Sequence, residues 1–255
     1  MTWDITWHVK NRRFTDTVLI EGLPGIANVG KIAVDFLVDE VKAKKLCTFT
    51  SNYLPQTVFI NEKGLIELSK IEMYYKRQKK GPDLIFLSGD IQPTNEVACH
   101  TLVKTIIDLV PILNIKEIYT TGGIGLQSVP DKPEVYATTN NVDLQKRLNK
   151  KQYKINTKIY GVVGPVMGVT GVLVARSPVP AAALLAETFG HQMYLGVKGA
   201  KAIVTSLGKI VGTKFNIKHL GKEVVDFENE VMQKTKELLQ ETVAGAKPVD
   251  NHYIG

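Results

Sequence analysis

Short apolar runs alternate with longer amphipathic segments along most of this chain. The short runs, such as residues 17–21 and 83–88, are rich in branched side chains, which is typical of strands covered on both faces. The longer segments repeat apolar residues every three or four positions, as helices do when one face is buried. Strands that alternate with helices favour a mostly parallel sheet between helical layers.

The pattern predicts a definite order of elements. Asn28 is placed to cap a helix that ends near Glu40, and the break at Glu62-Lys63-Gly64 predicts a hairpin. Further helices are predicted at 95–113, 143–149, 167–176, 195–211 and 218–244, and strands at 17–21, 47–51, 57–60, 65–75, 83–88, 117–121, 159–163 and 179–186.

Nothing in the composition divides the chain into separate folding units. No repeat, low-complexity tract or Pro/Ser-rich linker interrupts its 255 residues. We therefore predict a single α/β domain over residues 1–244, including a C-terminal helix, followed by a flexible tail over 245–255.

Charge and cysteine content narrow the class of protein. The two cysteines, Cys47 and Cys99, form neither a disulfide framework nor a C-x-x-C zinc pair, which favours a reducing compartment. No apolar segment is long enough to cross a membrane, and residues 1–4 lack the features of a secretory signal. The expected location is cytoplasmic. The net charge of +7 lies in short runs, so solvated loops explain it better than a nucleic-acid surface does.

One glycine-rich segment resembles a nucleotide-binding loop. Gly25 and Gly30-Lys31 have the G-x-x-x-x-G-K spacing of a P-loop between a strand and a helix. The next residue, Ile32, has no hydroxyl for Mg²⁺, which that motif requires. Gly25, Gly30 and Lys31 are thus weak cofactor-binding candidates, and glycines that allow a tight turn and close helix packing are the simpler interpretation.

Other chemistry is sparse in the sequence. The five histidines are scattered, and no two have metal-ligand spacing. No nucleophile stands beside a base, and the Gly122-Gly123-Ile124-Gly125 cluster opens no helix that could hold a phosphate. We predict no catalytic residue, no metal site and no cofactor.

Four stretches, in this order, resemble a known family. They are Glu21-Gly22-Leu23-Pro24-Gly25-Ile26-Ala27-Asn28-Val29-Gly30, Tyr119-Thr120-Thr121-Gly122-Gly123, Gly164-Pro165-Val166-Met167-Gly168-Val169-Thr170-Gly171 and Ala183-Leu184-Leu185-Ala186-Glu187-Thr188. Their order and spacing resemble the archaeal proteasome assembly chaperone family, the homologues of the second eukaryotic proteasome assembly chaperone.

The resemblance implies a nucleoside-phosphorylase-like fold and a non-enzymatic role. A protein of this family is expected to form a homo-oligomer and to bind proteasome α-subunits or a partner chaperone. The alternative is a nucleotide-dependent enzyme, since family members have been labelled ATP-grasp and the loop from Gly25 to Lys31 is P-loop-like. A nucleic-acid-binding module is a more distant third interpretation.

The resemblance also draws attention to the last residues, Tyr253, Ile254 and Gly255. Partners of the proteasome often end in a hydrophobic residue, a tyrosine and one further residue. Here the tyrosine is third from the end, one position out of that register. We name these three residues as the candidate partner-binding site; the alternative is a frayed terminus.

Overall fold

The computed structural model describes residues 3–191, 194–218 and 220 of the chain. Among these residues, eight strands form one sheet. In spatial order they are β1 (Asp4–Trp7), β3 (Lys44–Thr50), β6 (Ile71–Lys76), β7 (Leu84–Gly89), β2 (Thr17–Gly22), β8 (Ile115–Leu126), β10 (Ala181–Phe189) and β9 (Val135–Thr139).

The sheet is mixed and mostly parallel, as predicted. The four central strands β7, β2, β8 and β10 are parallel neighbours, and the pairings of the outer strands make β3 run the same way. Only β1, β6 and β9 run in the opposite direction. The central strands β2 and β7 are buried along their whole length, which explains their unbroken apolar sequence.

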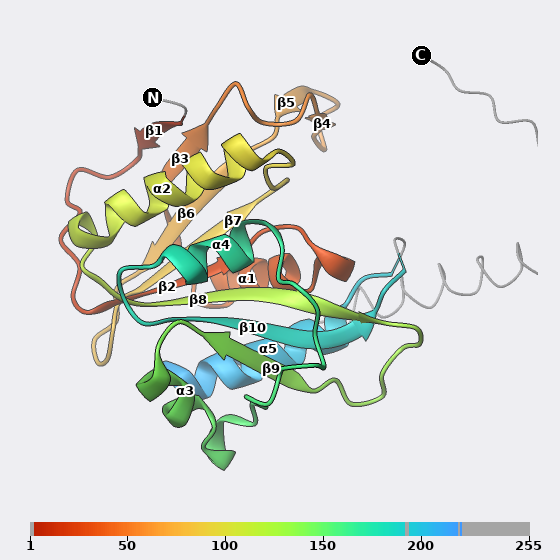
Figure 1. Cartoon of the computed structure of the whole chain (residues 1–255). Coiled ribbons are helices and arrows are strands. Elements are labelled where there is room, and N and C mark those ends of the chain that lie inside the picture. The colour runs from red at the N-terminus through yellow and green to blue at the C-terminus, as the bar shows by residue number, and fades with distance from the viewer. Residues whose placement is uncertain (1–2, 192–193, 219, 221–255) are drawn as a thin grey trace, which may run out of the picture.

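Helices cover both faces of the sheet (Figure 1). Helices α2 (Glu96–Ile112) and α4 (Gly168–Arg176) lie on one face, and α1 (Val29–Glu40) and α5 (Val197–Ile210) on the other. Successive side chains of β2 enter different cores: Leu19 packs in the α2–α4 core and Ile20 in the α1–α5 core. The short helix α3 (Val142–Leu148) packs beside β9.

The predicted strand at 159–163 is wrong. These residues form a turn, in which the Val162 amide donates to the Ile159 carbonyl and Tyr160 is fully exposed. Gly161 has a φ of +77°, in the left-handed region that suits a turn. The chain before it meets the outer edge of β9 at an isolated bridge between Asn156 and Tyr136. The branched residues at 159–163 favoured a strand, but the left-handed glycine among them places the segment in a turn.

Strand boundaries near glycine and proline also differ from the prediction. Strand β8 does not end at Gly122 but continues to Leu126, paired with β10 throughout. The strands β1 and β9 were not predicted; both are edge strands, and β9 follows closely on Pro133. The predicted strand 65–75 is two strands, β5 (Ile66–Leu68) and β6, because the chain leaves a hairpin at Ser69 and enters the main sheet.

The hairpin predicted at Glu62-Lys63-Gly64 is confirmed. Strands β4 (Val58–Ile60) and β5 pair antiparallel as a separate two-stranded sheet at the periphery of the molecule (Figure 1). The predicted C-terminal helix at 218–244 and the tail at 245–255 lie outside the described residues, apart from positions 218 and 220. Within the part of the chain that is described, no helix has the length and apolar character needed to span a bilayer.

Candidate interaction surface

The P-loop-like segment is a packed turn between β2 and α1. Asn28 precedes α1 as predicted, but its side chain makes no capping hydrogen bond, and both Ala27 and Asn28 adopt left-handed backbone angles. A Cβ atom on Gly30 would lie 2.4 Å from the carbonyl oxygen of Thr121 in β8. Gly30 is therefore explained by the close approach of α1 to the sheet. Gly25 has open space around it.

Lys31 is engaged along its own helix. Its Nζ atom lies 2.8 Å from Oδ2 of Asp35, one turn further on. Ser88, at the end of β7, donates a hydrogen bond of 2.5 Å to Oδ1 of the same carboxylate. The three side chains thus form a small polar cluster that links α1 to β7, and Asp35 already neutralises the charge that a phosphate would require.

Glu21 is the most unusual ionisable group of the family-like segment. It is fully buried at the end of β2, where Oε1 accepts a hydrogen bond of 2.9 Å from the Leu23 amide and Oε2 one of 3.3 Å from Thr170 in α4. Burial raises the pKa of Glu21 to about 7, although these hydrogen bonds act in the opposite direction. A side chain without exposed surface cannot contact a partner, so Glu21 serves to connect β2 with α4.

The β4–β5 hairpin exposes a cluster of apolar side chains. Its register pairs Val58 with Leu68 and Ile60 with Ile66, which places these four residues on one face. Each is 51–75% exposed. We call these four residues the aliphatic face. Contiguous exposed apolar residues of this kind mark interaction surfaces more often than isolated ones do.

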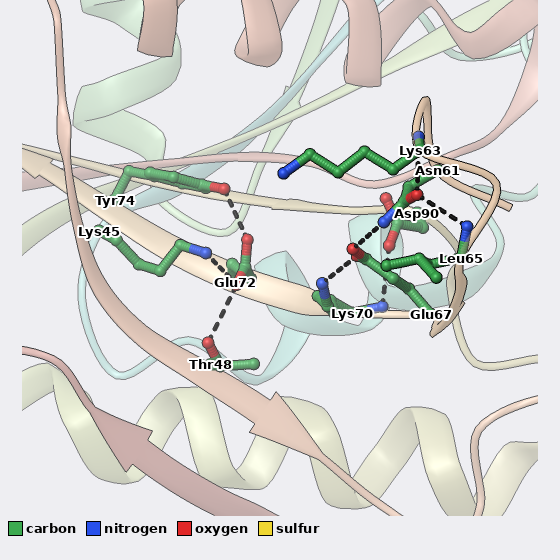
Figure 2. A network of polar contacts seen from close by, with 10 residues as sticks. All are labelled: Lys45, Thr48, Asn61, Lys63, Leu65, Glu67, Lys70, Glu72, Tyr74 and Asp90. Carbon is green, nitrogen blue, oxygen red and sulfur yellow. Dashed lines mark hydrogen bonds and ion pairs between the residues drawn. The ribbon is translucent and has the colours of Figure 1, made fainter. Parts of the chain in front are cut away.

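The opposite face of the hairpin carries the exposed Phe59 and Leu65 beside the polar Asn61 and Glu67. Its polar side chains are linked to the main sheet (Figure 2). Asn61 accepts hydrogen bonds of 3.0 Å from the amides of Lys63 and Leu65, which closes the turn, and donates one of 2.8 Å to Glu67. Glu67 pairs with Lys70 Nζ at 2.5 Å. The Lys70 amide in turn donates to Asp90 at 2.9 Å. This chain of contacts sets the orientation of the hairpin.

A second part of the network lies on the main sheet beside the hairpin (Figure 2). The carboxylate of Glu72 forms an ion pair of 2.7 Å with Nζ of Lys45. It also accepts hydrogen bonds from the hydroxyl groups of Tyr74, at 2.6 Å, and Thr48, at 3.0 Å. Burial alone would raise the pKa of Glu72, but these three contacts together hold it below the usual value. All these polar groups satisfy one another, so the network is a scaffold and not a reactive centre.

The described residues contain no group of three or more potential metal ligands. The candidate partner-binding residues Tyr253, Ile254 and Gly255 lie outside these residues. The aliphatic face was missed at the sequence level, because apolar residues in a predicted strand are expected to be buried. The sequence did contain one signal of this face. Val58 and Ile60 in one predicted strand, and Ile66 and Leu68 in the next, are apolar residues that share a face once the hairpin forms.

Known proteins resemble this chain over most of its length. A protein of Methanocaldococcus jannaschii with no assigned function is 29% identical over 257 residues, which span 98% of this chain and 97% of that protein. The crystal structure of Pyrococcus furiosus PbaB, an archaeal proteasome activator, matches with a TM-score of 0.83 and 28% identity, over 92% of this chain and 100% of PbaB.

A second solved structure shares the fold at lower identity. Pyrococcus furiosus PbaA, an archaeal homolog of proteasome-assembly chaperone, matches with a TM-score of 0.73 and 23% identity, over 94% of each chain. The resemblance that the four sequence stretches indicated is thus confirmed. The PAC2 family pattern matches residues 19–235, most of the sequence, and this chain therefore belongs to the PAC2 family.

Proposed function

We propose that this chain is a non-enzymatic binding protein that acts on the proteasome, as an assembly chaperone or an activator. The observation that carries the proposal is the similarity to PbaB, an archaeal proteasome activator, over 92% of this chain. The polar clusters of the described residues are internally satisfied, and the exposed feature is an apolar surface. A protein that works through surfaces fits this distribution better than an enzyme does.

The proposed partners are proteasome α-subunits or a related chaperone, together with further copies of this chain in a homo-oligomer. We place the protein in the cytoplasm, because both cysteines are buried free thiols and such thiols are typical of reducing compartments. The proposed organisation is a single domain over residues 1–244 and a tail over residues 245–255.

Native mass spectrometry of the protein with archaeal proteasome α-subunits tests the central proposal. The expected result is a complex that contains both proteins at micromolar concentration. If the two proteins do not associate directly or through a third protein of the assembly pathway, the proposed function is wrong.

The tail provides the sharpest prediction about the contact itself. We expect Tyr253 to dominate α-subunit binding, because a buried tyrosine combines a large apolar ring with one hydroxyl, and its truncation typically costs about 2 kcal/mol or more. Tyr253→Ala should therefore lose binding in a pull-down with α-subunits. Deletion of Gly255 moves the tyrosine to the second position from the end and should preserve or strengthen binding.

The same pull-down distinguishes the tail from the folded body. Wild type, Tyr253→Ala and the Gly255 deletion are compared at equal concentration. Undiminished binding by Tyr253→Ala would mean that the tail is a frayed end and that the body of the protein makes the contact.

A further inference from the structure

Basic residues that are far apart in the sequence meet at one cavity of the folded chain. The cavity has a volume of about 340 Å³, which is within the range of cavities that hold small ligands. Three lysines line it: Lys42 follows the end of α1, Lys76 is the last residue of β6, and Lys214 follows the end of α5. We call this cavity, defined by its three lysines, the basic cavity.

The positive charge of the chain is concentrated around the basic cavity. Residues 40–44, 76–84 and 209–215 carry eight basic and two acidic side chains, a formal charge of +6, whereas the whole chain carries +7. The pairing of Lys44 in β3 with Tyr75 in β6 brings the first two segments together. The fold thus gathers at one place a charge that the sequence shows only as separate short runs.

The described part of the chain does not neutralise the three lysines. None of the ion pairs between described residues includes Lys42, Lys76 or Lys214. The wall holds one carboxylate, Glu40, which accepts a hydrogen bond of 3.0 Å from the Asn216 amide. The C-termini of α1 and α5 add about half a negative charge each. These groups offset about two of the three positive charges, so the cavity stays positive.

The rest of the wall suits a small ligand better than a nucleic acid. Gln78 Nε2 donates a hydrogen bond of 3.2 Å to Thr213 Oγ1, which joins the turn after β6 to the end of α5. Phe215 is the only aromatic side chain in the wall that the described residues form, and it is buried. A nucleic-acid base therefore finds no exposed ring to stack on.

We propose that the basic cavity binds a small polyanion with several linked phosphate groups, through Lys42, Lys76 and Lys214. Lysine ammonium groups are compact point charges that bind phosphate oxygens. Three of them around one cavity match a chain of phosphates better than a single monovalent anion. The site is distinct from the P-loop-like segment, where Asp35 already neutralises Lys31.

Isothermal titration calorimetry of the full chain with sodium tripolyphosphate tests the proposal. Lys76→Gln removes a half-buried charge from the cavity, and Lys63→Gln removes an exposed charge from the hairpin turn, at the other end of β6. We expect one saturable site per chain. Lys76→Gln should raise the dissociation constant at least about tenfold. Lys63→Gln should raise it less than about twofold, because salt at about 0.15 M screens distant charges.

Protection from an amine-acetylating reagent gives a second readout that needs no substitution. Tripolyphosphate should slow the acetylation of Lys42, Lys76 and Lys214, measured by peptide mass spectrometry, and leave Lys63 unchanged. ATP without Mg²⁺ separates inorganic from organic phosphate chains. Equal affinity for the two would mean that the phosphate chain alone is recognised. Tighter binding of ATP would mean that its organic part also contacts the wall of the cavity.

Several outcomes would overturn the proposal. Binding that does not saturate, or that Lys63→Gln weakens as much as Lys76→Gln, would show that only the general surface charge attracts the anion. Inorganic phosphate that binds as tightly as tripolyphosphate would exclude recognition of linked phosphates. If a single-stranded oligonucleotide displaces tripolyphosphate and binds more tightly, and Lys76→Gln weakens it too, this face is a nucleic-acid surface and the small polyanion is the wrong ligand.

Discussion

At the scale of single residues, Glu21 makes the stability of the protein depend on pH. Its carboxyl group is buried between β2 and α4, and its pKa rises from 4.5 to about 7 on folding. Between these two values the folded state keeps a proton that the unfolded state releases, so the free energy of unfolding decreases as pH rises. The resulting loss is roughly 3 kcal/mol between pH 4.5 and 7.

Replacing Glu21 by Gln should remove this dependence. The amide oxygen can still accept the hydrogen bond from Leu23, but the side chain no longer ionises. Chemical denaturation between pH 4 and 8 should show the difference between wild type and Glu21→Gln changing mainly from pH 4.5 to 7. Glu62→Gln, at an exposed position, is the control. Parallel profiles for wild type and Glu21→Gln would contradict the assignment.

At the scale of elements, the packing of α1 on the sheet explains why Gly30 of the P-loop-like segment is a glycine. Gly30→Ala would place a methyl group 2.4 Å from the Thr121 oxygen. Alanine's helix propensity would add up to about 1 kcal/mol of stability, but overpacking against backbone typically costs about 1–3 kcal/mol. We expect a net loss of stability.

Gly25→Ala is the matched control for that substitution. Gly25 has extended backbone angles and no atom within 4 Å of a built Cβ, so its replacement should change stability by less than about 0.5 kcal/mol. Denaturation midpoints of both variants and of the wild type measure these changes in stability. Equal effects at the two positions would show that the helix does not approach β8 as closely as described.

At the scale of the whole molecule, the α/β body and the exposed β4–β5 hairpin are separate. Two cores, one on each side of the sheet, hold the α/β body together, and the hairpin lies beyond them (Figure 1). A surface that contributes little to folding can change without unfolding the domain.

The P-loop-like segment of the folded protein is not expected to bind ATP–Mg²⁺ specifically. Ile32 stands where a P-loop needs a hydroxyl, and Lys31 is paired with Asp35. A true ligand at 100 times its dissociation constant adds about 2.7 kcal/mol of stability, which a thermal shift assay would detect. Sodium pyrophosphate is the control for nonspecific anion binding. A shift of several degrees with ATP–Mg²⁺ that Lys31→Ala abolishes would support the nucleotide-dependent alternative.

Local sequence patterns were sufficient to predict many of the strands, helices and turns of the α/β body. The apolar run at 17–21 identified β2, and Asn95 caps α2 through its side chain, as its position before an amphipathic segment suggests. The turn residues Glu62-Lys63-Gly64 identified the hairpin. These features depend on periodicity and on turn chemistry, which act over a few residues and are therefore visible in the sequence.

Other features were decided only by the tertiary structure. Strand β9 exists because β10 has an edge to pair with, and 159–163 is a turn around the left-handed Gly161. Asn28 is left-handed because the chain must turn between β2 and α1. Hydrophobic sequence determined that Val58, Ile60, Ile66 and Leu68 form strands. Only the arrangement of the cores left them exposed, since burial depends on which surfaces meet in space and not on the residues alone.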